Sequence, residues 1–396
     1  MSRVVVTGVG AVSSIGTGAE FLTGLREGRC GARDITCFDT TGFPHARMHE
    51  VPDFPYDPEH PTQGIATQMT VAAARQAVTD PSVFSSVRGV VAVGTTDGDG
   101  RDLDALSAME LEKGLPNLDP LLARRFRMSR MPLSVASSLG LMDVEPLAFP
   151  NVCSAGNFAI GAGLDAIRSG EASYALVGGG DATDRRLFSA MYRYGALSPT
   201  TCRPFSADRT GVVFAEGAAM LMLESLEFAL ERGAPILAEV LDYNLTCDGN
   251  HPTRPFQEVV AECLRGALHN AGVEPSEVDL VMAHGTATKA NDPMECGALA
   301  DVFGDVPLPP ITGIKSMIGH TAGAAGAHSC VAGVLAIQHG FMPPTVGGPR
   351  VPDPECPVDV PAVARPADVR TVLVNALGFG GANAAVVLRR FEPALV

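Results

Sequence analysis

Tryptophan is absent from this chain of 396 residues, tyrosine is scarce, and cationic side chains are outnumbered by anionic ones. The chain has 5 tyrosines, 29 Lys and Arg against 44 Asp and Glu, and a formal net charge of −15. Because phosphate affinity comes from neutralisation by Lys and Arg, this charge argues against sequence-independent nucleic-acid binding. We therefore expect no nucleic-acid partner.

A long apolar run is also missing. No stretch approaches the roughly 20 apolar residues that span a bilayer. The start, MSRVVVTG, lacks the basic segment, the long apolar stretch and the cleavage site of a signal peptide. We expect no membrane association, and we predict a cytoplasmic protein.

The cysteines have no CxxC spacing and an odd total of 9. This usage fits reduced thiols, so we expect neither disulfides nor a metal site. Most free cysteines are small buried apolar groups, and a catalytic cysteine must be recognised by its surroundings.

What the chain does have is glycine and short β-branched runs. The 43 glycines, 46% hydrophobic residues and 18% charged residues indicate a globular protein with close backbone packing. The length allows two domains, one large α/β unit or two intimately packed halves. The pattern predicts buried strands over 4–10, 89–95, 174–180 and 278–285, with helices over 66–78 and 256–272 between them. Alternating strands and helices predict a parallel α/β architecture.

The chain also contains a weak internal repeat. A strand ending in Gly–Thr occurs in each half, as AVGT from Ala92 and as AHGT from Ala283, and a helix of small residues follows later in each half, from Cys153 and from His320. This suggests a duplicated fold whose halves are residues 1–234 and 235–396. Residues 37–61 and 97–119 lack clear periodicity, and we expect surface insertions or subunit contacts there.

Cys153 lies where a strand around residues 147–152 gives way to a helix that begins with small residues, and Gly170 is a plausible stop. At a helix N-terminus, unpaired N–H groups and the helix dipole stabilise a thiolate and lower the thiol pKa from about 8.5. The backbone N–H of Cys153 could also polarise the carbonyl of a thioester. This pattern makes Cys153 a candidate nucleophile.

Two histidines have similar glycine-bounded surroundings. His284 leaves an apolar strand into the polar loop HGTATKANDPME, and His320 lies in GIKSMIGHTAGAAGAHS, five residues after Lys315. Ligands of open α/β sheets bind at such strand ends. The remaining histidines lack this context, so we expect no catalytic role for His45, His49, His60, His251, His269, His328 and His339.

A cysteine and two neutral imidazoles suit one chemistry in particular. The cysteine can hold an acyl group, while decarboxylation of a malonyl thioester generates an enolate. Two N–H donors aimed at the enolate oxygen would form an oxyanion hole without a base of exceptional strength. We therefore predict carbon–carbon bond formation between an acyl thioester and a malonyl-type thioester.

The chain resembles the β-ketoacyl-acyl-carrier-protein synthases, the ketosynthase branch of the thiolase superfamily, over nearly its whole length. The motifs that carry the resemblance are RVVVTGVGAVSSIG, VCSAG, CRPFSADRTGVVFAEGAA, AHGTATKANDPME, KSMIGHTAGAAG and ALGFGGANAAVVL. The resemblance implies a thiolase-like five-layered αβαβα sandwich built from two similar halves. It also implies a dimer, either a homodimer or a heterodimer with a related ketosynthase-like subunit.

The resemblance assigns roles to particular residues. It implies that Cys153 accepts the acyl group, that His284 and His320 act in decarboxylation, and that Lys315 supports them. Phe379 would gate the site, with Gly378 and Gly380 beside the substrate. Thr286 and Thr288 would contact the phosphopantetheine arm of an acyl carrier protein, and no cofactor would be bound by the enzyme itself.

The motifs also differ from those of relatives. Degradative thiolases use a second cysteine and chain-initiating synthases use His and Asn, whereas both later motifs here carry histidine. The family often has a Glu nine residues after the second histidine, where this chain has Ser329, and NVCSA and ALGFGG replace more usual patterns. A ketosynthase-like acyltransferase without decarboxylation therefore stays open as an alternative. A non-catalytic subunit of the chain-length-factor type, which usually lacks the nucleophile, is disfavoured by Cys153.

Two other interpretations are weaker. GVGAVSSIG has Ser13 where a dinucleotide-binding loop needs a third glycine, and a cysteine hydrolase does not explain two histidines in equivalent turns.

Acyl carrier proteins are acidic, so docking should use basic residues. The stretch ARRFRMSR supplies a candidate docking face at Arg124, Arg125, Arg127 and Arg130.

Overall fold

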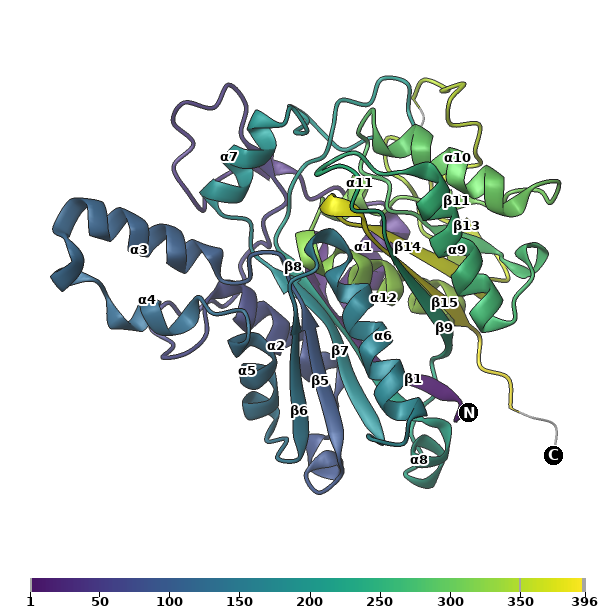
Figure 1. Cartoon of the computed structure of the whole chain (residues 1–396), viewed down its shortest axis with the longest axis horizontal. Coiled ribbons are helices and arrows are strands. Elements are labelled where there is room, and N and C mark those ends of the chain that lie inside the picture. Colours follow the sequence, from purple (N-terminus) through teal and green to yellow (C-terminus); the bar gives the residue numbers. More distant parts are fainter. Residues whose placement is uncertain (1, 349, 394–396) are drawn as a thin grey trace.

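Two layers of β-strands, separated and flanked by helices, form the molecule in the computed structural model, which describes residues 2–348 and 350–393 (Figure 1). The strands of the main sheet are β1 (Val4–Ser13), β2 (Gly16–Thr17), β5 (Gly89–Gly94), β6 (Val144–Phe149), β7 (Tyr174–Asp181), β8 (Gly217–Ser225), β9 (Ala238–Cys247), β10 (Leu280–Met282), β11 (Ile311–Thr312), β14 (Thr371–Leu377) and β15 (Ala382–Arg389). Two small ribbons pair β3 (Arg33–Asp34) with β4 (Arg47–Met48) and β12 (Phe341–Met342) with β13 (Arg365–Pro366).

The helices connect these strands. The α-helices are α1 (Ala19–Glu27), α2 (Ile65–Ala77), α3 (Gly100–Lys113), α4 (Pro120–Arg125), α5 (Arg130–Leu139), α6 (Ala155–Arg168), α7 (Arg185–Arg193), α8 (Leu226–Glu231), α9 (Gln257–Ala271), α10 (Asn291–Phe303), α11 (Lys315–Ile318) and α12 (Ala325–His339). The short 3₁₀ helices are η1 (Pro81–Phe84), η2 (Leu115–Asn117), η3 (Val152–Ser154), η4 (Pro275–Glu277), η5 (Ala322–Ala324) and η6 (Phe379–Gly381).

The main sheet repeats one topology twice. Its order is β11-β10-β14-β15-β9 followed by β1-β8-β7-β5-β6, with β2 added beside β1. Each half contributes five strands to this order, if β2 is left out. Counted from the outer edge inward, they are the third, second, fourth, fifth and first of those five strands along the chain. Only two residue pairs, Val5 with Glu239 and Val6 with Ala238, join the halves at β1 and β9. We propose that the halves divide between residues 234 and 235, in the connection from α8 to β9.

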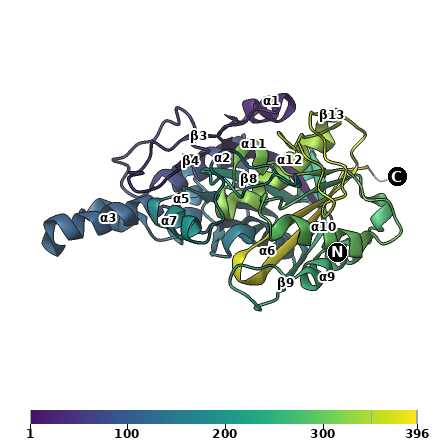
Figure 2. The same ribbon diagram turned by 90° about the horizontal axis from the view of Figure 1, so that it is seen from above.

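The helices complete five layers. α6 and α12 lie in the middle and contact strands of both halves, α2 and α5 cover the outer face of the first half, and α9 and α10 cover that of the second (Figure 2). This is the predicted αβαβα sandwich. α6 and α12 are rich in Gly and Ala, so they pack closely against each other and against both sheets.

The prediction of a parallel sheet is only partly right. β6, β5 and β7 are parallel, as are β11, β10 and β14, but β8 and β15 run antiparallel to β7 and β14. The short turn between β14 and β15 explains one reversal, because adjacent antiparallel strands need no crossover helix. The sheet is therefore mixed.

Most of the predicted elements lie close to those observed, although the strand predicted over 278–285 is only Leu280–Met282 in β10. α9 is capped by Gly272, which takes a left-handed conformation. β5 ends one residue earlier than predicted, and α2 begins and ends one residue earlier. Residues 97–119, expected to be irregular, contain the helix α3. This helix belongs to a protruding arm and buries only Gly100, Asp102 and Leu106, so its sequence has no apolar stripe to reveal it.

Gly94 ends β5 directly under the first turn of α6. A β-carbon at this position would lie 2.2 Å from the carbonyl carbon of Ala155. We predict that Gly94→Ala lowers the free energy of unfolding by about 2 kcal/mol or more, because the backbone of α6 must move. Gly333→Ala, where the nearest atoms are side-chain methyl groups at 3.3 Å, should stay near wild type. Urea denaturation of both variants checks this; equal midpoints would contradict it.

Candidate active site

Cys153 occupies the turn η3 between β6 and α6, at the strand-to-helix junction that its sequence predicts. The preceding Val152 has a φ of 46°, a left-handed conformation that is rare for a β-branched residue. Such backbone strain gathers at functional sites and here turns the chain sharply at the nucleophile. Cys153 lines a cavity that opens to solvent, with about 830 Å³ of empty space when the open mouth is included.

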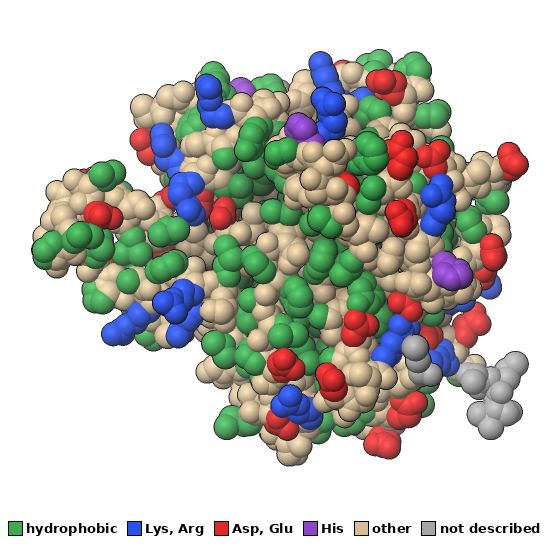
Figure 3. Space-filling view, in the orientation of Figure 1, with side chains coloured by type: hydrophobic (Ala, Val, Ile, Leu, Met, Phe, Trp, Pro, Cys, Tyr) green, Lys and Arg blue, Asp and Glu red, His purple; other side chains and the backbone are tan. Residues whose placement is uncertain are grey.

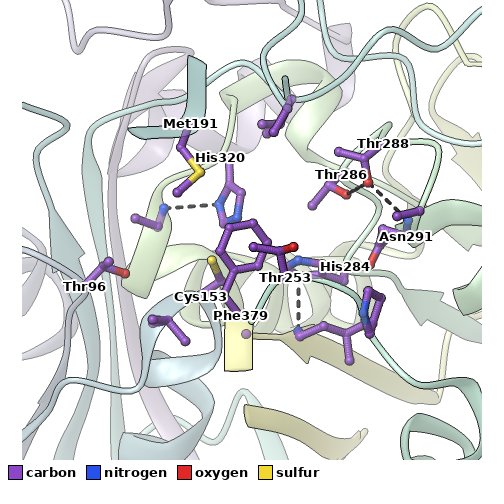
Figure 4. Close-up of a pocket in the computed structure, with 18 of the residues that line it drawn as sticks. Thr96, Cys153, Met191, Thr253, His284, Thr286, Thr288, Asn291, His320 and Phe379 are labelled. Carbon is purple, nitrogen blue, oxygen red and sulfur yellow. Dashed lines mark hydrogen bonds between the residues drawn. The ribbon is translucent and has the colours of Figure 1, made fainter. Parts of the chain in front are cut away.

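The two histidines line the same cavity, although they come from different parts of the second half. His284 follows β10, and His320 follows α11 and precedes η5. Their ring centroids lie 5.5 Å apart with the planes at 84°, and Phe214 stacks on the His320 ring at 5.4 Å (Figure 4). The structure therefore brings Cys153, His284 and His320 together around one space.

Backbone hydrogen bonds select the tautomer of each histidine. The N–H of Leu377 donates to Nδ1 of His284 at 3.2 Å, and the N–H of Ala322 donates to Nδ1 of His320 at 3.2 Å. A neutral imidazole whose Nδ1 accepts must carry its proton on Nε2. Both rings therefore keep an Nε2–H donor for the cavity.

Burial keeps both rings neutral. The pKa of His284 and the pKa of His320 are both lowered well below the usual value of 6.5, first by desolvation and then by the nearby Lys315. Their neutral forms are present at neutral pH and would be lost only as the pH falls through these lowered pKa values. The pair can donate hydrogen bonds to a developing oxyanion without first losing a proton.

Lys315 and Glu295 support His284 from behind. Lys315 is buried, donates a hydrogen bond from Nζ to the backbone oxygen of His284, and lies 3.5 Å from Nδ1 of its ring. Glu295 in α10 accepts from the N–H groups of His284 at 2.7 Å and Gly285 at 2.9 Å, and also from the Asn375 amide at 2.7 Å. These contacts hold the loop after β10 in place.

Asp181, at the end of β7, is a buried group that the sequence did not single out. Its carboxylate accepts hydrogen bonds from the N–H groups of Thr96 at 2.7 Å, Asp97 at 3.0 Å and Gly98 at 2.8 Å. It also accepts from the Gly323 N–H at 2.6 Å, in the turn that follows His320. Burial raises the pKa of Asp181 to about 6, which leaves it ionised at neutral pH. A single carboxylate thereby ties the first half to the turn behind His320.

Phe379 and the predicted substrate-binding residues also line the cavity. Gly378 precedes the turn η6, which contains Phe379 and Gly380, and the rings of Phe379 and Tyr194 lie perpendicular with their centroids 6.3 Å apart. Thr286 and Thr288 lie on the other side of His284, with their hydroxyl oxygens 3.1 Å apart. Thr253, Arg254 and Asn291 also line the cavity, and the sequence had not marked them.

Comparison with protein families agrees with this geometry. Residues 1–229 match the N-terminal domain of β-ketoacyl synthases and residues 237–348 match the C-terminal domain. The chain belongs to the β-ketoacyl synthase family.

Individual relatives are similar to this ketosynthase over nearly its whole length. The 3-oxoacyl-[acyl-carrier-protein] synthase 2 of Coxiella burnetii is 33% identical, over 98% of this chain and 98% of its own. A structure of the ishigamide ketosynthase/chain length factor is 48% identical with a TM-score of 0.95, over 99% of this chain and 100% of its own. The type II polyketide ketosynthase AntDE, in complex with its acyl carrier protein AntF and bound to a hexaketide, is 30% identical with a TM-score of 0.91, over 98% and 100%.

These findings confirm the predicted activity. The protein is an acyltransferase of the 3-oxoacyl-acyl-carrier-protein synthase type, which condenses an acyl group with malonyl-acyl carrier protein in fatty-acid or polyketide synthesis. Substrates of this family are bound to the carrier protein. None of the helices in the described part of this ketosynthase has the length and apolar character needed to cross a membrane.

The predicted docking face needs a correction. Arg125 is only 1% exposed, donates to the backbone oxygen of Pro58 and lies 3.9 Å from the carboxylate of Asp102. It therefore holds α4 against the rest of the molecule and cannot meet a partner. Arg124 and Arg127 are exposed and Arg130 is half-buried. The sequence showed four arginines within eight residues, but it did not show that Arg125 points inward.

The predicted low pKa of Cys153 is wrong. Burial raises the pKa of this thiol to about 11, although Lys315 and the N–H groups of Cys153 and Phe379 act in the opposite direction. The helix terminus therefore does not compensate for the loss of water around the sulfur. At neutral pH most of the sulfur is protonated.

Alkylation of Cys153 should therefore accelerate steeply with pH. Since the thiolate is the reactive form, its modification by iodoacetamide should rise about tenfold per pH unit from pH 7 to pH 10. Peptide mass spectrometry measures the adduct, and the exposed Cys247, followed in the same digests, controls for reagent loss. A plateau in the Cys153 rate below pH 9 would show that the thiolate already dominates.

Proposed function

We propose that Cys153 carries the acyl group and that His284 and His320 together stabilise the enolate of a malonyl thioester. The observation that carries this proposal is the convergence of one thiol and two Nε2–H donors on a single cavity. Paired neutral donors favour decarboxylation over simple acyl transfer, because hydrolysis or transfer develops no enolate oxygen for them to hold. The acyltransferase without decarboxylation, which the sequence left open, is therefore disfavoured.

The reaction has two halves. First, the Cys153 sulfur attacks the carbonyl of an acyl thioester, the carrier thiol leaves, and the Cys153 proton ends on that thiol. A malonyl thioester then loses CO₂, and its enolate oxygen accepts hydrogen bonds from the two histidines. The enolate carbon attacks the Cys153 thioester, forming the new C–C bond and releasing the Cys153 sulfur as a thiolate, which takes up a proton from solvent. The N–H groups of Cys153 and Phe379, which favour negative charge on the sulfur, are placed to support the oxyanion of these attacks.

The substrates would arrive on the phosphopantetheine arm of an acyl carrier protein, and we propose no cofactor bound by the ketosynthase itself. Thr286 and Thr288 give the arm hydroxyl partners beside His284. Arg254 is exposed at the rim of the cavity, where it could meet the phosphate. Phe379 would act as the gate between this entrance and Cys153. Nine free cysteines accord with the cytoplasmic location that we propose.

We also propose pairing with a second copy or with a related ketosynthase-like subunit. β6 is an outer strand of the sheet, with Leu147 and Phe149 half-buried on it, and an exposed strand edge favours pairing with another chain. The arm formed by α3, η2 and α4 protrudes beside it and carries Leu111, 89% exposed, and Leu115, 66% exposed (Figure 3). Apolar side chains gathered on a protruding arm are typical of a subunit contact.

Decarboxylation of malonyl-acyl carrier protein tests the proposed roles. We predict that His284→Ala and His320→Ala each slow CO₂ release by about 10²–10³, since each removes one oxyanion donor. Cys153→Ala should abolish condensation but keep decarboxylation, and His339→Ala, which removes an exposed histidine, should change neither. A wild-type chain that releases no CO₂ but accepts acyl groups would favour the acyltransferase. A chain inert in both assays would favour a non-catalytic carrier-binding subunit.

Docking on the exposed arginines is tested by charge reversal. If Arg124 and Arg127 meet an acidic carrier, the double variant Arg124→Glu, Arg127→Glu should raise the KM for acyl-carrier substrates about tenfold at low salt, and less at high salt. The rate with a free pantetheine thioester should not change. Arg265→Glu, on α9 in the other half, is the control. An unchanged KM for carrier-bound substrate would exclude this face.

A further inference from the structure

The cavity has two chemically different sides. In Figure 4, Thr286, Thr288 and Asn291 lie beyond His284, whereas Met191 and Thr96 lie on the side of Cys153 and His320. The first side is the polar entrance already described. The second, which we call the acyl wall, is formed by Leu187, Met191, Ala196, Val212, Phe214 and Ala322.

The acyl wall has no polar side chain. Met191, Val212, Phe214 and Ala322 belong to one buried hydrophobic cluster together with Phe188, and Leu187 packs against it. The material behind the wall is therefore apolar as well. No carboxylate, amide or guanidinium among these residues can turn toward a substrate.

The backbone of the wall offers few donors either. The N–H of Val212 donates to the oxygen of Ala196 at 2.8 Å, and the N–H of Ala196 donates to the oxygen of Met191 at 3.2 Å. The N–H of Ala322 is engaged by Nδ1 of His320, and that of Leu187 by the Asp184 carboxylate. These four donors are already used inside the protein.

One hydroxyl group, that of Thr96, lies next to the acyl wall on the side of Cys153. Thr96 points its oxygen toward Cys153 in Figure 4, and this buried oxygen has no hydrogen-bond partner among residues 2–348 and 350–393. It can serve one oxygen close to the thioester. Oxygens farther along an acyl chain would meet only the apolar wall.

We propose that the acyl group on Cys153 is a hydrocarbon chain, saturated or unsaturated, and that the acyl wall excludes a chain bearing ketones beyond its first carbons. A poly-β-ketone would bury a carbonyl at every second carbon, and a buried acceptor without a donor is costly. A hydrocarbon chain has no such groups and gains from leaving water. This inference rests on the proposed role of Cys153 and names the class of acyl group that the site accepts.

Matched pantetheine thioesters test the inference. Wild-type protein is offered hexanoyl and 5-oxohexanoyl thioesters in separate reactions, and intact mass follows the adduct on Cys153. Transfer of the 5-oxohexanoyl group should be about 10-fold slower, because its ketone is buried without a donor. Transfer of a 3-hydroxyhexanoyl group should be slowed less than transfer of the 5-oxohexanoyl group, since the Thr96 hydroxyl lies close enough to the thioester to serve its oxygen.

Variants of α7 locate the effect. Met191→Gln places an amide donor in the acyl wall and should reduce the discrimination between hexanoyl and 5-oxohexanoyl groups to about 3-fold or less. Leu187→Gln provides a second test if the first variant does not fold. Ala190→Gln adds the same amide on the exposed face of the helix and should retain the wild-type ratio.

The outcomes separate this inference from the proposed function. Equal transfer of both groups by wild type, or a ratio that Met191→Gln and Leu187→Gln leave unchanged, would overturn the acyl wall as the discriminating surface. Absence of any adduct on Cys153, with every thioester, would instead overturn the role proposed for the cysteine.

Discussion

The arrangement depends on one buried carboxylate. Asp181 ends a strand of the first half and accepts hydrogen bonds from the loop after β5 and from the Gly323 N–H in the second half. Gly323 has no side chain, and a β-carbon there would lie 2.5 Å from the backbone of Thr95. The two halves can approach this closely only because small residues meet around a charge that several N–H groups share. His320 is thereby held across the cavity from Cys153.

The same burial that positions the site determines its electrostatics. Removing water from the sulfur and from both imidazoles disfavours every charged form, so the pKa of Cys153 rises while the pKa values of His284 and His320 fall. Backbone donors to Nδ1 then leave each ring with one proton, on Nε2. The resting site is uncharged apart from its supporting groups, and negative charge that appears during the reaction meets donors already in place.

The sequence predicted the parts of this site that depend on local pattern. Cys153, His284 and His320 each follow a recognisable strand end or glycine-bounded turn, and the resemblance to ketosynthases brought them together before the structure did. Asp181 was missed because it ends an ordinary buried strand, and its importance lies in contacts with residues more than 80 positions away. The inward direction of Arg125 and the high pKa of Cys153 were also missed, since both arise from tertiary burial. The helix α3 escaped prediction because it has little buried surface.

The central claim is that two neutral imidazoles present Nε2–H donors to one cavity beside a thiol. Side-chain ¹⁵N NMR of the histidines, assigned with His284→Ala and His320→Ala, measures the protonation state and tautomer of each ring directly. We predict that both rings stay neutral from pH 6 to pH 8, with the proton on Nε2 in each. A positively charged ring at pH 7, or a neutral ring protonated on Nδ1, would contradict the account.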